Sequence, residues 1–107
     1  LEKAKEAWIS MIEKALAVNI KVVLCTPTPD QSENILDTTT ALYKHTQQII
    51  QLANKYKIGL VDSYNAFRQL IAGGNDLKKY MSQVNHPGKA GHEVVLEEIM
   101  KLFPGSL

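Results

Sequence analysis

The residues best suited to chemistry lie near the carboxyl end of the chain, in the run 84–95. His86 stands before a proline, which keeps it out of the helical region of backbone space, and Pro87 fixes its own φ. The apolar spacing of a helix begins just after a second histidine, His92. An imidazole titrates near neutral pH, so a histidine on a rigid loop before a helix can act as a general base. The same residue types also suit an ordinary turn, so they do not decide the function alone.

Metal binding is the weaker interpretation of the histidines. His45, His86 and His92 are far apart in the sequence, and no pair has the i, i+4 spacing of a helical zinc motif. The lone Cys25 cannot form an internal disulfide, so it does not indicate a redox compartment. We interpret Cys25, at the end of a predicted strand, as a small buried apolar residue.

Length and charge restrict the classes of function. A chain of 107 residues forms one domain at most, and a net charge of +1 argues against nucleic-acid binding. The longest apolar runs are too short to span a membrane. No signal peptide is visible at Leu1, where the chain already follows a helical pattern. We expect the chain to be part of a longer protein, and its compartment stays unknown.

Apolar periodicity predicts alternating helices and strands. Helices are expected over residues 1–18, 41–56, 64–72 and 93–103, with a helical turn within 76–81. Thr38 or Thr39 is expected to cap the second helix, and Pro104 and Gly105 to end the last. Residues 20–24 and 58–61 are apolar without alternation, which is typical of strands buried on both faces. We therefore expect Val23, Leu24, Leu60 and Val61 to be buried.

This order predicts an α/β fold: a parallel, flavodoxin-like sheet with helices on both faces. Two strands are too few, because sheets usually have about five. The others must come from sequence absent here or from a second copy of the chain. Sites in such sheets lie beyond the carboxyl ends of the strands. Residues 25–29 and 62–64 form two such ends, and we expect the His86 loop to join them there, with its ring open to solvent.

A family resemblance gives the histidine a more specific role. The pattern N-H-P-x-x-x-G-H before an amphipathic helix, at residues 85–92, resembles the last conserved block of the GDSL-like (SGNH) esterases and acylhydrolases. A strand ending in T-P-x-P and another ending in V-D-S-Y precede it in the family's order. The resemblance implies that residues 1–107 are the C-terminal part of one SGNH-hydrolase-like domain, that His86 is the catalytic base, and that no metal or organic cofactor takes part.

The sequence also departs from the family. No G-D-S block with the nucleophilic serine is present, and the positions where the family carries its Asp hold Ser82 and Gln83. Ser63 is the least implausible nucleophile, although a role in capping a helix explains it. The run 73–76, Gly-Gly-Asn-Asp, matches the family's G-x-N-D block but is better explained as a helix end and loop.

Two functions follow from these observations. In the first, the parent protein hydrolyses a small ester or acylated carbohydrate through a Ser-His dyad or triad, with the serine in the missing half. This chain alone would then be inactive, and its partners would be that half or a second copy. In the second, the chain belongs to a catalytically silent binding or interaction module on the same scaffold. Nucleic acid and a membrane span are expected in neither case.

Overall fold

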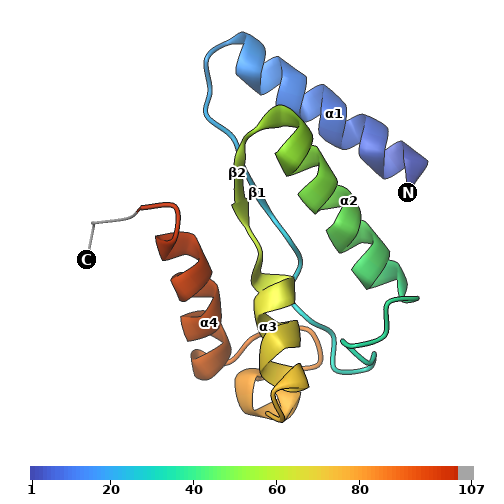
Figure 1. Cartoon of the computed structure of the whole chain (residues 1–107), viewed down its shortest axis with the longest axis vertical. Helices are drawn as coiled ribbons and strands as arrows, with labels where there is room; N and C mark the ends of the chain where they lie inside the picture. The colour runs from blue at the N-terminus through green and yellow to red at the C-terminus, as the bar shows by residue number, and fades with distance from the viewer. Residues whose placement is uncertain (104–107) are drawn as a thin grey trace.

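The computed structural model describes residues 1–103 and alternates helices with two short strands (Figure 1). The elements are α1 (Glu2–Ala17), β1 (Val23–Cys25), α2 (Ala41–Tyr56), β2 (Gly59–Val61), α3 (Ser63–Ala72), the 3-10 helix η1 (Leu77–Tyr80) and α4 (Lys89–Met100). The α/β class predicted from the sequence is confirmed.

The two strands form a parallel pair at the centre of the molecule. Leu24 lies opposite Leu60, and Cys25 opposite Val61. In Figure 1, α1 and α2 lie on one side of the pair, α4 lies on the other, and α3 continues from the carboxyl end of β2. A parallel strand pair with helices is therefore present, while a full flavodoxin-like sheet stays a prediction.

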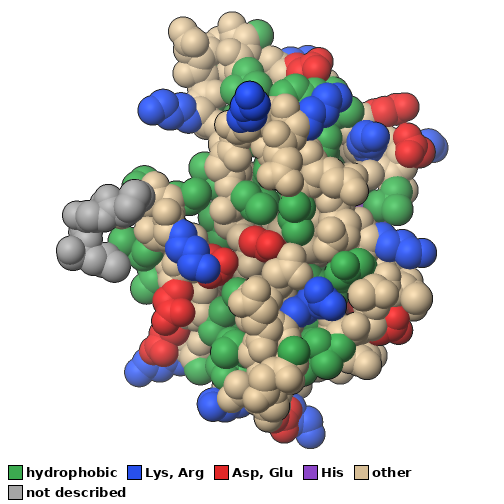
Figure 2. Space-filling view, viewed as in Figure 1, with side chains coloured by type: hydrophobic (Ala, Val, Ile, Leu, Met, Phe, Trp, Pro, Cys, Tyr) green, Lys and Arg blue, Asp and Glu red, His purple; other side chains and the backbone are tan. Residues whose placement is uncertain are grey.

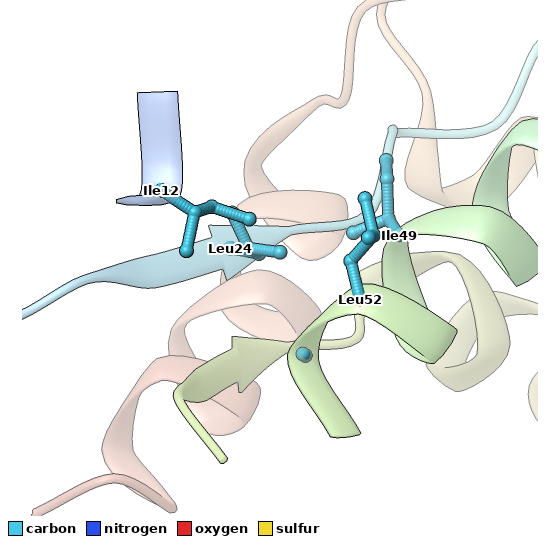
Figure 3. Close-up of a cluster of buried hydrophobic side chains, with 5 residues drawn as sticks. Ile12, Leu24, Ile49 and Leu52 are labelled. Atoms are coloured by element: carbon cyan, nitrogen blue, oxygen red, sulfur yellow. The ribbon is translucent and has the colours of Figure 1, made fainter. Parts of the chain in front are cut away.

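One apolar cluster fills the space between the strands and the first two helices. Ile12 from α1 and Leu24 from β1 meet Ile49, Leu52 and Ala53 from α2, all at most 6% exposed (Figure 3). Trp8 and Leu60 are among the half-buried side chains around them. This cluster fixes the direction of β1 and with it the position of the loop that follows.

A second cluster lies beyond the carboxyl ends of the strands. Tyr64 and Phe67 from α3 pack against Ile35 and Tyr80, and Phe67 is fully buried. The rings of Phe67 and Tyr80 meet edge to face, with centroids 6.1 Å apart. Because Tyr80 ends η1, this cluster anchors the start of the loop that carries His86.

Both strands are shorter than predicted, and for the same reason. The chain turns at Asn19 with φ of 63°, and the N–H of Ile20 donates to the carbonyl of Ala15 in α1 at 3.0 Å. Likewise, the N–H of Ile58 donates to the carbonyl of Ala53 in α2 at 3.1 Å. These helix-end bonds use backbone groups that the sequence pattern assigned to strands.

The helices follow the predictions more closely. The bounds of α2 are as predicted, although its cap is Thr40, whose hydroxyl accepts from the N–H of Tyr43 at 3.1 Å. The last helix begins at Lys89, four residues earlier than expected. Lys89 and Ala90 favour a helix by their intrinsic propensity, but they do not follow the apolar spacing from which the start was predicted. It ends at Met100, and the predicted stop at Pro104 and Gly105 lies outside the described residues.

The prediction that all strand side chains are buried is wrong in part. Leu24 and Val61 are buried and Leu60 is half-buried, but Val23 is 48% exposed and Cys25 is also exposed. Val23 and Cys25 flank Leu24, which packs against α1 and α2, so their side chains lie on the opposite face of β1. In Figure 1, α4 lies on the side of the strand pair opposite to α1 and α2, and it contacts β2. Figure 2 shows apolar side chains reaching the surface over the strand pair in the middle of the face shown.

We expect this chain to be stable only when a neighbour extends the sheet. In a parallel strand alternate residues direct their backbone groups to opposite edges, and Leu24 faces β2. The backbone groups of Val23 and Cys25 therefore point to the outer edge, a template for further pairing. Light scattering at micromolar concentration should show a dimer or larger species. A monomer that unfolds cooperatively would contradict this expectation.

Candidate functional site

The loop between η1 and α4, residues 81–88, is closed by its own backbone. Met81 and Pro87 form an isolated antiparallel bridge, and the N–H of Gly88 donates to the carbonyl of Tyr80 at 2.8 Å. The carbonyl of His86 accepts from the N–H of Ser82 at 2.9 Å and of Gln83 at 3.2 Å. The backbone of His86 is thus fixed within a narrow hairpin.

The hairpin is also held by the loop that follows β1. The N–H of Gln31 donates to the carbonyl of Val84 at 2.8 Å, and its side-chain amide donates to the carbonyl of Gln83 at 2.9 Å. The hydroxyl of Thr28 lies 3.4 Å from the carbonyl of Asn85. In Figure 1 the segment before α4 accordingly runs beside the segment that leaves β1. The His86 loop therefore lies at the carboxyl-end rim of the strand pair, as predicted.

The two strand ends are joined at the same rim by Thr26, which is 4% exposed. Its hydroxyl donates to Oδ1 of Asp62 at 3.0 Å and accepts from the N–H of Tyr64 at 3.0 Å. Asp62 caps α3, because Oδ1 accepts from the N–H of Asn65 at 3.4 Å. The end of β1, the end of β2 and the start of α3 therefore form one polar junction.

The side chain of His86 is exposed, and no hydrogen bond within residues 1–103 involves its ring. The two positions expected to hold an acid serve the backbone instead. The hydroxyl of Ser82 lies 3.2 Å from the carbonyl of His86, and the N–H of Gln83 bonds to the same carbonyl. Neither side chain orients the imidazole, so the ring is open to a partner from outside the described residues.

The fold is similar to part of a solved structure from a lipolytic protein family. The chain is similar to a member of the lipolytic protein G-D-S-L family from Veillonella parvula DSM 2008, with a TM-score of 0.71 over 94% of this chain. The two sequences are 16% identical, so the likeness concerns the fold. No protein-family model and no curated protein matches the sequence. At the level of the fold, the resemblance to GDSL-like hydrolases is confirmed.

The similarity covers only a portion of the Veillonella protein. This chain spans 52% of the length of the Veillonella protein. The proportion is consistent with the expectation that residues 1–107 correspond to the C-terminal half of such a domain.

No serine within residues 1–103 makes a hydrogen bond to the ring of His86. Ser63 is 3% exposed as the first residue of α3, where the chain leaves the strand pair. Its burial supports the interpretation that it belongs to the strand end and helix start. Ser32 is exposed, and its hydroxyl bonds to Asp30 at 2.7 Å. Ser10 and Ser82 are exposed on α1 and on the His86 loop, and Ser106 lies outside the described residues.

The Gly-Gly-Asn-Asp run is a helix end followed by a cap, as interpreted from the sequence. Gly73 is the C-cap of α3, and Gly74 has φ of 101°. The amide of Asn75 donates back to the carbonyl of Leu70 at 3.0 Å, and Asp76 caps η1. The amide that would match an oxyanion donor is thus engaged with α3.

The remaining candidates stand apart from one another. His45 is half-buried on α2, and His92 is exposed in the first turn of α4. Within residues 1–103, no group of three or more His, Cys, Asp or Glu side chains is placed to hold a metal ion. None of the helices in this range is long and apolar enough to cross a bilayer.

The expectation that Cys25 is buried is wrong, because the face of β1 that carries it is left open.

Sequence reasoning missed the residues that hold the loop. Gln31 follows β1 but belongs to no motif, and Thr28 fills only the variable position of the T-P-x-P run. Their partners are backbone carbonyls more than 50 residues away, such as that of Gln83, 52 residues from Gln31. Gly91 was noted only as part of the G-H pair. A Cβ at Gly91 would overlap the carbonyl of Tyr80 and the ring of Pro87, so α4 packs directly on the loop.

Proposed function

We propose that this chain is the histidine-bearing part of a GDSL-like serine esterase or acylhydrolase, with His86 as its general base. The observation that carries the proposal is the loop itself. Its backbone is bonded to the segment that follows β1, while the ring of His86 faces solvent at the rim where α/β enzymes place their sites. The fold likeness to a lipolytic protein supports the same assignment.

In this proposal the nucleophilic serine and the oxyanion donors come from outside residues 1–107. His86 accepts the proton of the serine hydroxyl as the oxygen attacks the ester carbonyl. It then returns that proton to the leaving alkoxide, which releases the alcohol and leaves an acyl-enzyme. Water, deprotonated by the same imidazole, releases the acid and restores the serine. The substrate is a small ester or an acylated carbohydrate.

The missing carboxylate shapes the mechanism. With Ser82 and Gln83 bonded to the backbone of His86, a Ser-His dyad is the form that this chain supports. A triad requires a carboxylate from the other half of the domain. A dyad is slower, because no fixed negative charge stabilises the imidazolium that forms during attack.

The same observation favours a second candidate function. An exposed histidine whose ring has no hydrogen-bond partner within the described residues also suits a catalytically silent binding module on this scaffold. The two candidates differ in one measurable property, which is turnover of an ester by the longer protein.

We expect residues 1–107 alone to hydrolyse p-nitrophenyl acetate no faster than a histidine-only background. A base without its nucleophile and oxyanion donors loses most of the rate, since these groups act as a unit. The longer gene product should hydrolyse the same ester with saturation kinetics. Saturable hydrolysis by the chain alone, lost in Ser63→Ala but kept in Ser10→Ala, would contradict the proposal. An inert longer protein would favour the binding module.

A further inference from the structure

We infer that Gln31 is a positioning residue for His86, which deepens and rests on the function proposed above. Gln31 lies in the segment between β1 and α2, far from the histidine in sequence. Its backbone N–H and its side-chain amide donate to two successive carbonyls of the His86 loop, at 2.8 Å to Val84 and 2.9 Å to Gln83. One residue thereby fixes two peptide planes of the loop.

The contacts around Gln31 form a continuous set. Thr28, at 3.4 Å from the carbonyl of Asn85, engages the next peptide along, so carbonyls 83, 84 and 85 all face the same segment. The carbonyl of His86 turns the other way and accepts from Ser82 and Gln83 within the hairpin. The carbonyls of residues 83–86 are therefore all bonded, and Gln31 supplies two of the three hydrogen bonds that tie them to the segment after β1.

The segment that carries Gln31 is itself held in shape. Oδ1 of the neighbouring Asp30 accepts from the hydroxyl of Ser32 at 2.7 Å and from its N–H at 2.9 Å. These hydrogen bonds, the hydroxyl first, lower the pKa of the Asp30 carboxyl. Pro29, fully buried, fixes the backbone just before this turn. A rigid turn is what a donor needs to hold a second loop in place.

The positioning role of Gln31 follows from the few other contacts that hold the backbone of the His86 loop. The side chains of Ser82, Gln83, Val84 and Asn85 are all exposed, so side-chain packing does not fix this part of the loop, although α4 packs on its end at Pro87. Its hydrogen bonds to the body of the protein on the β1 side come from Thr28 and Gln31. A misplacement of about 1 Å in a catalytic group can cost as much as 10²-fold in rate. Loss of the Gln31 amide should therefore reach the chemistry through His86.

The test uses two substitutions. Gln31→Leu removes the polar group, and Gln31→Glu keeps the length and polarity of the side chain but removes the amide donor. Gln51→Leu, on the exposed face of α2, is the matched control. The order parameters are measured on residues 1–107 in the assembly in which the chain is stable. We expect the backbone order parameters of residues 83–86 to fall below about 0.6 in both Gln31 variants, while those of the other residues stay unchanged. In the longer protein we expect kcat to fall about ten-fold while KM stays within about two-fold.

Each outcome decides a different claim. A loop that stays ordered in both variants would overturn the inference, and so would a mobile loop with unchanged kcat in a protein that His86→Gln inactivates. If His86→Gln leaves the activity intact, the proposed function fails, and the positioning role for catalysis fails with it. The order parameters still show, in that case, whether Gln31 holds the loop.

Discussion

Replacing His86 by glutamine in the longer protein is expected to lower kcat/KM for p-nitrophenyl acetate about a thousand-fold. A positioned general base contributes roughly 10²- to 10⁴-fold, and a serine hydroxyl is a weak nucleophile without one. Glutamine fills a similar volume but accepts no proton near neutral pH. Because the side chain of His86 is exposed and makes no hydrogen bond within residues 1–103, the fold should tolerate the change.

His92 provides the matched control for this substitution. It is the same residue type, six positions further along, and its side chain is also exposed, on α4. We expect His92→Gln to keep kcat/KM within about two-fold, and both variants to keep the wild-type melting temperature. Equal losses in the two variants would mean that a general effect of the region, and not the base, was measured.

Gly91→Ala is expected to destabilise the chain by about 2 kcal/mol and to displace the His86 loop. The added Cβ would meet the backbone carbonyl of Tyr80 and the ring of Pro87, so α4 has to move away from the loop. Overpacking of this kind costs about 1–3 kcal/mol, which exceeds the gain of up to ~1 kcal/mol in helix propensity. Urea unfolding of the two proteins, compared at the midpoint, measures the difference.

Gly73→Ala separates this effect from a general response to removing a glycine. Gly73 ends α3 with φ of −78°, and a Cβ there would be 3.4 Å from the carbonyl of Gln69, an ordinary contact. We expect a change of less than about 0.5 kcal/mol for this exposed position. If Gly91→Ala is equally mild, the close approach of α4 to Tyr80 is not a constraint on the fold.

Local patterns predicted the helices well, because each helix is specified by its own residues. The apolar spacing and flanking residues of 41–56 gave both ends of α2, and the helix expected over 64–72 begins only one residue earlier, at Ser63. The start of α4 was missed because Lys89 and Ala90 carry no apolar periodicity. The H-P dipeptide likewise predicted, from local backbone constraints alone, that His86 lies on a loop.

Features that depend on distant partners were beyond such reasoning. The starts of the strands are a local exception, because they follow helix-end bonds from Ile20 to Ala15 and from Ile58 to Ala53 that the apolar pattern does not show. Val23 is apolar but exposed, because its burial depends on what covers the outer face of β1. Gln31 donates hydrogen bonds to backbone carbonyls of another loop. Every residue type has a backbone carbonyl, so the sequence does not show which residues Gln31 bonds to.

The most direct test of the account is to label the longer protein with a fluorophosphonate, which reacts with a serine activated by a base, and to map the modified residue by mass spectrometry. We predict a single labelled serine outside residues 1–107 and a large loss of labelling in His86→Gln but not in His92→Gln. An esterase-active protein labelled at Ser63 or at another serine of this chain, or labelled equally in both variants, would contradict the assignment of His86 as its general base.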